Sequence, residues 1–130
     1  MDKQMMTEII EQEGNESIFY IKEYKCEALR QETFEFWCGY ISRKDGEPLS
    51  DVEREIFDTF SIGGTTYNGE HLMGFDCGHH GQLVPGFLTN PILEAEDKVS
   101  PMDYYVTLRN VEDVLEETAN AMNQACQSSC

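Results

Sequence analysis

A chain of 130 residues with nine basic and twenty-five acidic side chains carries a formal net charge of −16 at pH 7, and its length suits one compact domain over residues 1–130. This charge repels nucleic acid and anionic membrane surfaces, so we expect neither as a direct partner. It attracts basic protein surfaces instead, because carboxylates can occupy a cationic groove where phosphates would otherwise bind.

The sequence shows no signal for export or membrane insertion. The N-terminal segment MDKQMMTEIIEQEG has acids on both sides of a short apolar run and no basic start. No stretch approaches the roughly 20 apolar residues of a membrane span. An odd number of cysteines without a CxxC spacing is typical of reduced thiols, so we expect a cytosolic protein. The cysteines are Cys26, Cys38, Cys77, Cys126 and Cys130.

The first forty residues predict one helix and two paired strands. Apolar residues recur at helical spacing before Gly14, which suits a C-cap. They are Met5, Met6, Ile9 and Ile10. The segments 17–29 and 33–41 are rich in aromatic and β-branched residues, which favours strands. By the two-residue period, one face of the second strand carries Phe34, Phe36, Cys38 and Tyr40.

After a loop at 43–48, the chain predicts a short helix and a hairpin. Ser50 and Glu53 stand at the spacing of a capping box, which indicates the start of the helix. Its expected inner side carries Val52, Ile56 and Phe57. The segments 62–67 and 71–77 predict two strands with a tight turn at 68–69, because an Asn-Gly dipeptide readily adopts positive φ angles.

The last predicted element is an amphipathic helix that begins at Asn110. Its inner face carries Val111, Val114, Leu115, Thr118, Ala119 and Met122. Its acidic outer face, either solvated or bound to a partner, carries Glu112, Asp113, Glu116 and Glu117. Together these elements predict an α+β fold, in which a mainly antiparallel sheet of about four strands is flanked by helices on one side, including this C-terminal helix.

The stretch GGTTYNGEHLMGFDCGHHGQL at 63–83 concentrates glycines and reactive side chains. A turn after Cys77, which Gly78 and Gly81 would ease, gathers carboxylate and imidazole groups at one end of the sheet. With the preceding strand they would line a polar recess for a ribose, a base edge or a partner backbone. The expected recess consists of Thr65, Thr66, Tyr67, Asp76, His79 and His80.

The chemistry of this stretch stays open. Asp76, Cys77 and His79 could ligate a metal, but structural zinc needs a second ligand pair and no spacing supplies one, so we expect neither metal nor cofactor. Cys77 with a histidine base would give a thiol hydrolase. Alternatively, Cys77 is a small buried residue, the histidines bind backbone groups, and the glycines serve turns and close strand packing.

Five segments follow one another between residues 24 and 122: YKCEALR, WCGYISRKDGEPL, GGTTYNG, GFDCGHHGQLVPG and YVTLRNVEDVLEETANAM. In that order they resemble an uncharacterised family of small proteins from bacteriophage and prophage genomes, with the signature GGxTYxG followed by GFDCxHxG. The chain departs from the family at Glu47 and Ile62, where the family has His, and at Gln82, where it has Asp. Two expected ligands of any family metal site are therefore absent.

The resemblance implies a phage accessory protein in the host cytosol, and such proteins commonly block host immunity. The leading hypothesis is an antagonist that works by binding rather than catalysis. It either inhibits a defence effector, such as a CRISPR nuclease, through the acidic surface, or sequesters a nucleotide second messenger in the recess. The alternatives are a metal-assisted or thiol-dependent hydrolase using Asp76, Cys77, His79 and His80, and a structural virion component. A homo-oligomer also stays open.

Overall fold

The computed structural model describes residues 1–129, with side chains described as far as Cys126. Cys130 lies outside the described residues. Five strands form one antiparallel sheet in the order β1-β2-β3-β5-β4. They are β1 (Glu16–Ile21), β2 (Tyr24–Arg30), β3 (Trp37–Arg43), β4 (Tyr67–Asn68) and β5 (Leu72–Asp76). The predicted α+β class is confirmed, although the sheet has five strands rather than about four.

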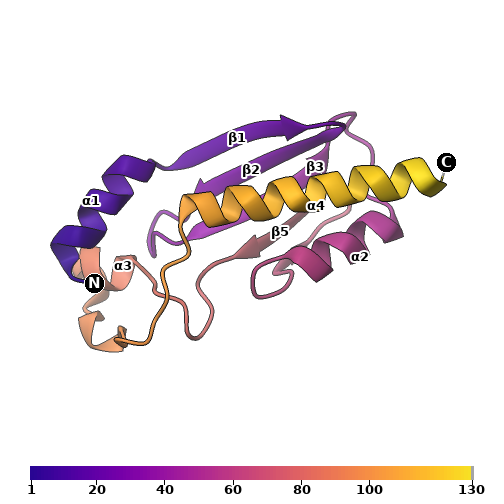
Figure 1. Ribbon diagram of the computed structural model, residues 1–130. Helices are drawn as coiled ribbons and strands as arrows, with labels where there is room; N and C mark the ends of the chain where they lie inside the picture. Colours follow the sequence, from indigo (N-terminus) through magenta and orange to yellow (C-terminus); the bar gives the residue numbers. More distant parts are fainter. Residues whose placement is uncertain (130) are drawn as a thin grey trace.

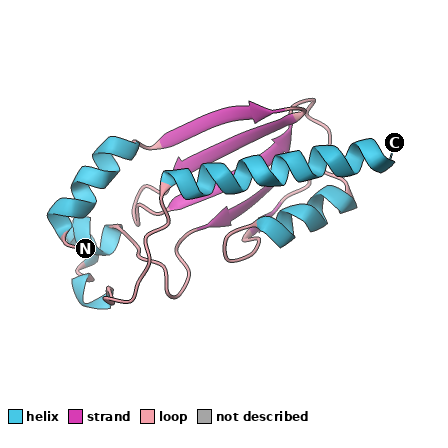
Figure 2. Ribbon diagram, in the orientation of Figure 1, coloured by secondary structure: helices cyan, strands magenta, loops and turns pink. Residues whose placement is uncertain are grey.

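The helices divide into two groups (Figure 1). The long helix α4 (Leu108–Ser129) crosses one face of the sheet, and α2 (Asp51–Phe60) packs beside it on the same side. The N-terminal helix α1 (Lys3–Glu13) lies beyond one end of the sheet, next to the short α3 (Gly86–Thr89). Two 3-10 turns follow α3, at Pro91–Leu93 and Glu96–Lys98. The face under α2 and α4 is called the covered face below, and the opposite one the open face (Figure 2).

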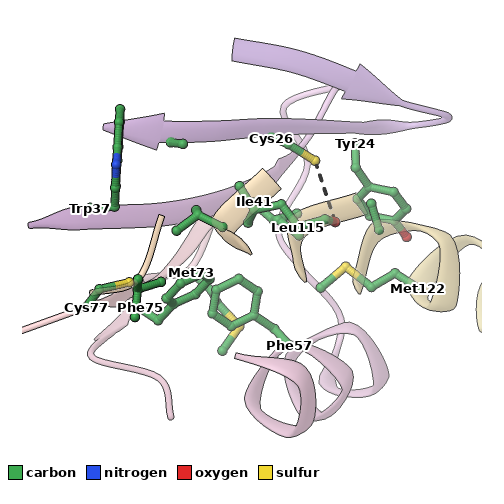
Figure 3. Packing of buried hydrophobic residues seen from close by; sticks show 14 of the residues in the cluster. Tyr24, Cys26, Trp37, Ile41, Phe57, Met73, Phe75, Cys77, Leu115 and Met122 are labelled. Carbon is green, nitrogen blue, oxygen red and sulfur yellow. Dashed lines mark hydrogen bonds between the residues drawn. The ribbon is translucent and has the colours of Figure 1, made fainter. Parts of the chain in front are cut away.

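The core lies between the covered face and the two helices. Alternate residues of the strands are buried there, as the two-residue period of a strand requires. The rings of Phe57 from α2 and Phe75 from β5 meet with their centroids 6.0 Å apart, and Leu115 of α4 lies over the strands (Figure 3). The Cys26 thiol points at the Leu115 carbonyl at 3.9 Å. The predicted inner face of the C-terminal helix is confirmed, with Val114 half-buried and the other five residues buried.

Glu13, the last residue of α1, joins four parts of the chain. Its carboxylate accepts hydrogen bonds from Arg30 Nη2 at 3.0 Å, Trp37 Nε1 at 3.2 Å and the backbone N of Leu108 at 2.8 Å, and also from the Tyr105 hydroxyl. Burial alone would raise the pKa of Glu13, but these hydrogen bonds outweigh it and lower the pKa below its usual value. The charged carboxylate thus fastens α1 and the start of α4 to the sheet.

Glu53 plays a comparable part at the other end of the molecule. The predicted capping box is confirmed: Ser50 Oγ accepts from Glu53 N, and Glu53 Oε1 accepts from Ser50 N at 2.8 Å. The same carboxylate, which is fully buried, accepts from the Tyr24 hydroxyl and lies 3.5 Å from Arg43. Val52, predicted on the inner side of this helix, is instead 45% exposed, because Glu53 occupies the buried position beside Phe57.

The structure corrects the predicted strands at three places. The segment 17–29 is a hairpin, because the chain turns at Lys22–Glu23 with Lys22 at φ 54°. The strand expected at 33–41 begins only at Trp37, so Phe34 lies in the preceding turn. Most of 62–67 is loop. The next hairpin turns at 70–71 rather than at 68–69, since Gly69 N still donates to the Leu72 carbonyl at 2.9 Å.

Candidate functional site

The open face presents a line of side chains that crosses the whole sheet. The strand register places Ile18, Glu27, Tyr40, Gly74 and Tyr67 opposite one another, from β1 to β4. Tyr67 is 53% exposed and Ile18 is 47% exposed, whereas Tyr40 is half-buried. The centre of this line is hollowed. An open hollow of about 270 Å³ is lined by Glu27, Leu29, Tyr40, Tyr67 and Leu72.

Glycines shape this face because aromatic rings lie against them. A Cβ at Gly74 would stand 2.5 Å from two carbons of the Tyr40 ring, and a Cβ at Gly78 would stand 2.7 Å from the Phe36 ring. Real Cβ atoms do not approach so closely, so only glycine lets these rings lie down on the sheet. Part of the glycine content of the 63–83 stretch is therefore explained by the seating of aromatic side chains.

The six residues of the predicted recess occupy several positions. Asp76 and His79 are brought together at the end of β5, with His79 Nε2 lying 3.6 Å from Asp76 Oδ1. That distance exceeds a normal hydrogen bond. The two groups form an ion pair only when the imidazole is protonated. Asp76 Oδ1 also accepts from Gly78 N at 3.0 Å. The His79 ring lies against Gly63, where a Cβ would stand 2.6 Å away.

The other four recess residues differ in exposure, with Thr65 half-buried and Thr66, Tyr67 and His80 exposed. Thr66 N donates to the Gly74 carbonyl at 2.9 Å. Tyr67 lines the hollow of the open face. Thr65 Oγ1 and His79 Nε2 are buried atoms without a hydrogen-bond partner among the described residues. Of the six side chains, Asp76 and His79 are the two that lie against each other.

The cysteine of the GFDCGHH stretch faces away from solvent. Cys77 is 1% exposed and lies with the covered-face residues (Figure 3). Burial raises the pKa of its thiol to about 12, and the neighbouring Cys38 and Asp76 add to the effect. The thiolate that nucleophilic catalysis needs is therefore disfavoured at neutral pH. The thiols of Cys26, Cys38, Cys77 and Cys126 are free, and within residues 1–126 no three His, Cys, Asp or Glu side chains are gathered to hold a metal ion.

The predicted acidic face of α4 has one inward contact and three exposed members. Glu112 is half-buried and accepts a hydrogen bond from Ser17 Oγ at 2.7 Å, so it fastens α4 to β1. Asp113, Glu116 and Glu117 are exposed, and Arg109 lies 3.4 Å from Asp113. This face therefore presents negative charge to the solvent.

The nine basic residues offset only part of the charge of twenty-five acidic residues. Four of the five lysines are exposed, and each of the four arginines binds a group of the protein. Arg30 is almost wholly buried, with its guanidinium 4.3 Å from the centre of the Trp37 ring. The other three pair with acids or with backbone carbonyls, and they are Arg43, Arg54 and Arg109. Among the described acidic residues only Glu53 is buried, and most are exposed. The outward electrostatic field is accordingly negative over much of the molecule.

Comparison of the chain with protein-family models, curated proteins and solved structures gave no match. Within the described residues, no helix combines the length and the apolar character that crossing a bilayer requires. The structural evidence on function therefore consists of the surface of this chain.

Sequence reasoning missed four of the five residues that line the hollow, namely Glu27, Leu29, Tyr40 and Leu72. The sequence did contain one indication of the hollow. Tyr40 lies on the aromatic face predicted for the second strand, and the structure makes that face the open one. The register that brings Glu27 beside Tyr40 is that of the β2–β3 pair, and the connection at 31–36 that joins these strands, with Glu35 at φ 62°, carried no local signal for it.

Proposed function

We propose that this protein is a phage-encoded antagonist of bacterial immunity that works in the host cytosol by binding a basic surface of a defence protein. The observation that carries the proposal is the excess of exposed carboxylates, because most of the twenty-five acidic residues are exposed and only nine basic residues oppose them. A surface of this kind draws in and orients a basic partner, such as the nucleic-acid groove of a CRISPR nuclease. The resemblance to phage proteins supplies the biological setting.

The same charge disfavours the second branch of the hypothesis, in which the protein sequesters a nucleotide signal. Nucleotide second messengers are anions and need cations or clustered donors for their phosphates. The predicted recess offers His79 beside the carboxylate of Asp76, and the field around it is negative. We therefore place the inhibitor of a protein effector first.

The hydrolase alternative receives less support from the geometry. A thiol enzyme needs an accessible nucleophile with a lowered pKa, whereas Cys77 is buried and its pKa is raised. The Asp76–His79 pair alone provides a base without the nucleophile that the thiol-dependent mechanism requires.

The proposal is tested by expressing the protein in bacteria that carry individual defence systems and measuring phage plating. Relief of one system by the wild-type chain is expected, followed by binding of its purified effector at a rate that falls with salt. Exposed charges more than about 10 Å apart are screened at 0.1 M salt, so electrostatic attraction should fade between low and moderate ionic strength.

A pair of matched variants separates a local interface from net charge. The double change Glu116→Lys and Glu117→Lys reverses the α4 face, and Glu8→Lys with Glu11→Lys makes the same change in net charge on exposed residues of α1. Weaker effector binding by the first variant alone assigns the interface to α4. Equal weakening by both assigns the effect to overall charge. Failure to relieve any defence system, or a salt-independent association rate, contradicts the proposal.

A further inference from the structure

The geometry of the open face points to a more specific contact: we infer that the hollow beside Tyr40 receives an arginine side chain of the partner protein. The inference rests on the proposed function, because it names the chemistry of the partner surface. At about 270 Å³ the hollow is smaller than the roughly 300–1,000 Å³ of small-molecule pockets. One long side chain suits it better than a nucleotide does.

The lining matches the two parts of an arginine. The faces of the Tyr40 and Tyr67 rings attract a cation, and Glu27, directly opposite Tyr40 in the register, offers a carboxylate to the guanidinium. Leu29 and Leu72 provide apolar surface for the aliphatic stem. A planar guanidinium can stack on a ring and bind a carboxylate in the same pose, which the ammonium of lysine cannot do.

The local potential has the right sign for this occupant. Burial and the neighbouring Cys38 raise the pKa of Tyr40 to about 12, and the carboxylates of Asp76 and Glu27 add to the effect, so both acids act on this side of the sheet. A second copy of the chain is a poor occupant, because two molecules of charge −16 repel each other. The charge complementarity therefore selects a basic partner.

One cation already lies near the hollow. Lys25 Nζ is 3.7 Å from Glu27 Oε1, and both side chains are partly exposed. Such an exposed pair contributes little free energy, so an incoming guanidinium can displace the ammonium. Removing Lys25 should therefore strengthen arginine binding, whereas removing Glu27 should weaken it.

The test uses N-acetyl-arginine methylamide as the probe and the citrulline derivative as its neutral isostere, with binding followed by NMR. We expect the arginine probe to shift the ring signals of Tyr40 and Tyr67 and the citrulline probe to bind more weakly. Glu27→Gln and Tyr67→Ala should each weaken the arginine complex roughly threefold, the size of one exposed ion-pair or cation–π contact. Lys25→Gln should strengthen it, and Glu8→Gln on the exposed side of α1 should leave it unchanged.

Several outcomes would overturn the inference: equal binding of the two probes, signal shifts confined to α4, or no effect of Glu27→Gln. Unchanged dispersion of the amide spectrum shows that each variant is folded, and Tyr67→Phe, which keeps the ring, should retain binding. Unchanged affinity of Tyr67→Ala and Glu27→Gln for the effector that the wild-type chain binds contradicts the hollow but leaves the proposed function intact. Absence of relief by the wild-type chain contradicts the proposed function, and the probe titration then decides about the hollow alone.

Discussion

Two neighbouring cross-strand pairs of β3 and β5 use the same contact on opposite faces of the sheet. On the covered face the Phe75 ring of β5 lies over Gly39 of β3, and on the open face the Tyr40 ring of β3 lies over Gly74 of β5. In each pair a Cβ on the glycine would stand 2.5 Å from the ring. Helices α2 and α4 enclose Phe75, which is 1% exposed, whereas Tyr40 is half-buried and lines the hollow. The same ring-on-glycine contact thus forms part of the core on one face and part of the hollow on the other.

The largest effect in this comparison should come from removing the enclosed ring. Phe75→Ala is expected to lower the free energy of unfolding by about 3 to 5 kcal/mol, because it opens a cavity against Phe57. Tyr40→Ala should cost clearly less, since the half-buried ring faces solvent. Urea unfolding of the two variants measures the difference. Equal losses would mean that the open face is packed as tightly as the core.

Glu13 tests whether the covered face depends on its polar anchor. Glu13→Gln should lower the free energy of unfolding by roughly 2 to 4 kcal/mol at pH 7, because it removes the charged acceptor of several buried donors. The pKa of Glu13 is lowered in the folded state, so its contribution is present above the usual value of 4.5 and is lost as pH falls through the folded pKa.

Stability measured from pH 7 to pH 2 checks the sign of this effect. The wild-type chain should lose stability over that range more steeply than Glu13→Gln does, so the two curves should converge at low pH. Parallel curves would show that the carboxylate does not titrate with folding. Glu8→Gln on α1 serves as the control, because its side chain is exposed.

The two glycines give the most direct comparison of the faces. Gly39→Ala should cost about 1 to 3 kcal/mol, because the enclosed Phe75 ring has no room to move. Gly74→Ala should cost less, since the Tyr40 ring can swing toward solvent, but it should weaken binding of the arginine probe. Thermal unfolding and the probe titration are measured on both variants. A larger stability loss for Gly74→Ala would reverse the assignment of the faces.

The smallest effect on stability is expected from Tyr67→Ala. The side chain is 53% exposed, and surface substitutions of this kind change the free energy of unfolding by no more than about 0.5 kcal/mol. The melting temperature should therefore stay close to that of the wild-type chain. A loss above 1.5 kcal/mol, compared with the roughly 0.5 kcal/mol of surface changes, would show that Tyr67 is part of the fold.

The predictions from sequence succeeded where the signal was local. The Ser50–Glu53 capping box, the Gly14 C-cap and the apolar spacing of α4 each lie within a few turns of one helix. The Lys22–Glu23 hairpin was not predicted, because neither residue is a usual turn former. The φ angle of 54° at Lys22 accompanies the pairing of β1 with β2.

The site was harder to predict than the fold, for a physical reason. Strand periodicity separates the two faces of a strand but does not say which face helices will cover, so Phe36 and Tyr40 gave no sign of lying on the open face. The hollow needs five residues from four strands in register. No sequence spacing encodes that assembly. The composition of the 63–83 stretch predicted a site there. The structure shows that Gly74 and Gly78 make room for the rings of Tyr40 and Phe36.

The hydrogen bond from Leu108 to Glu13 also has a consequence for the order of folding. It joins residues 95 positions apart, as does the bond from Ser17 to Glu112. The β1–β2 and β2–β3 hairpins are local and can form early, but contacts of such long range form slowly because a large loop must close first. Until α4 docks, the apolar face of the sheet lacks the cover of Val111 and Leu115 and is shielded only in part by α2. A growing chain that has not reached residue 108 is therefore expected to be at its most prone to aggregation.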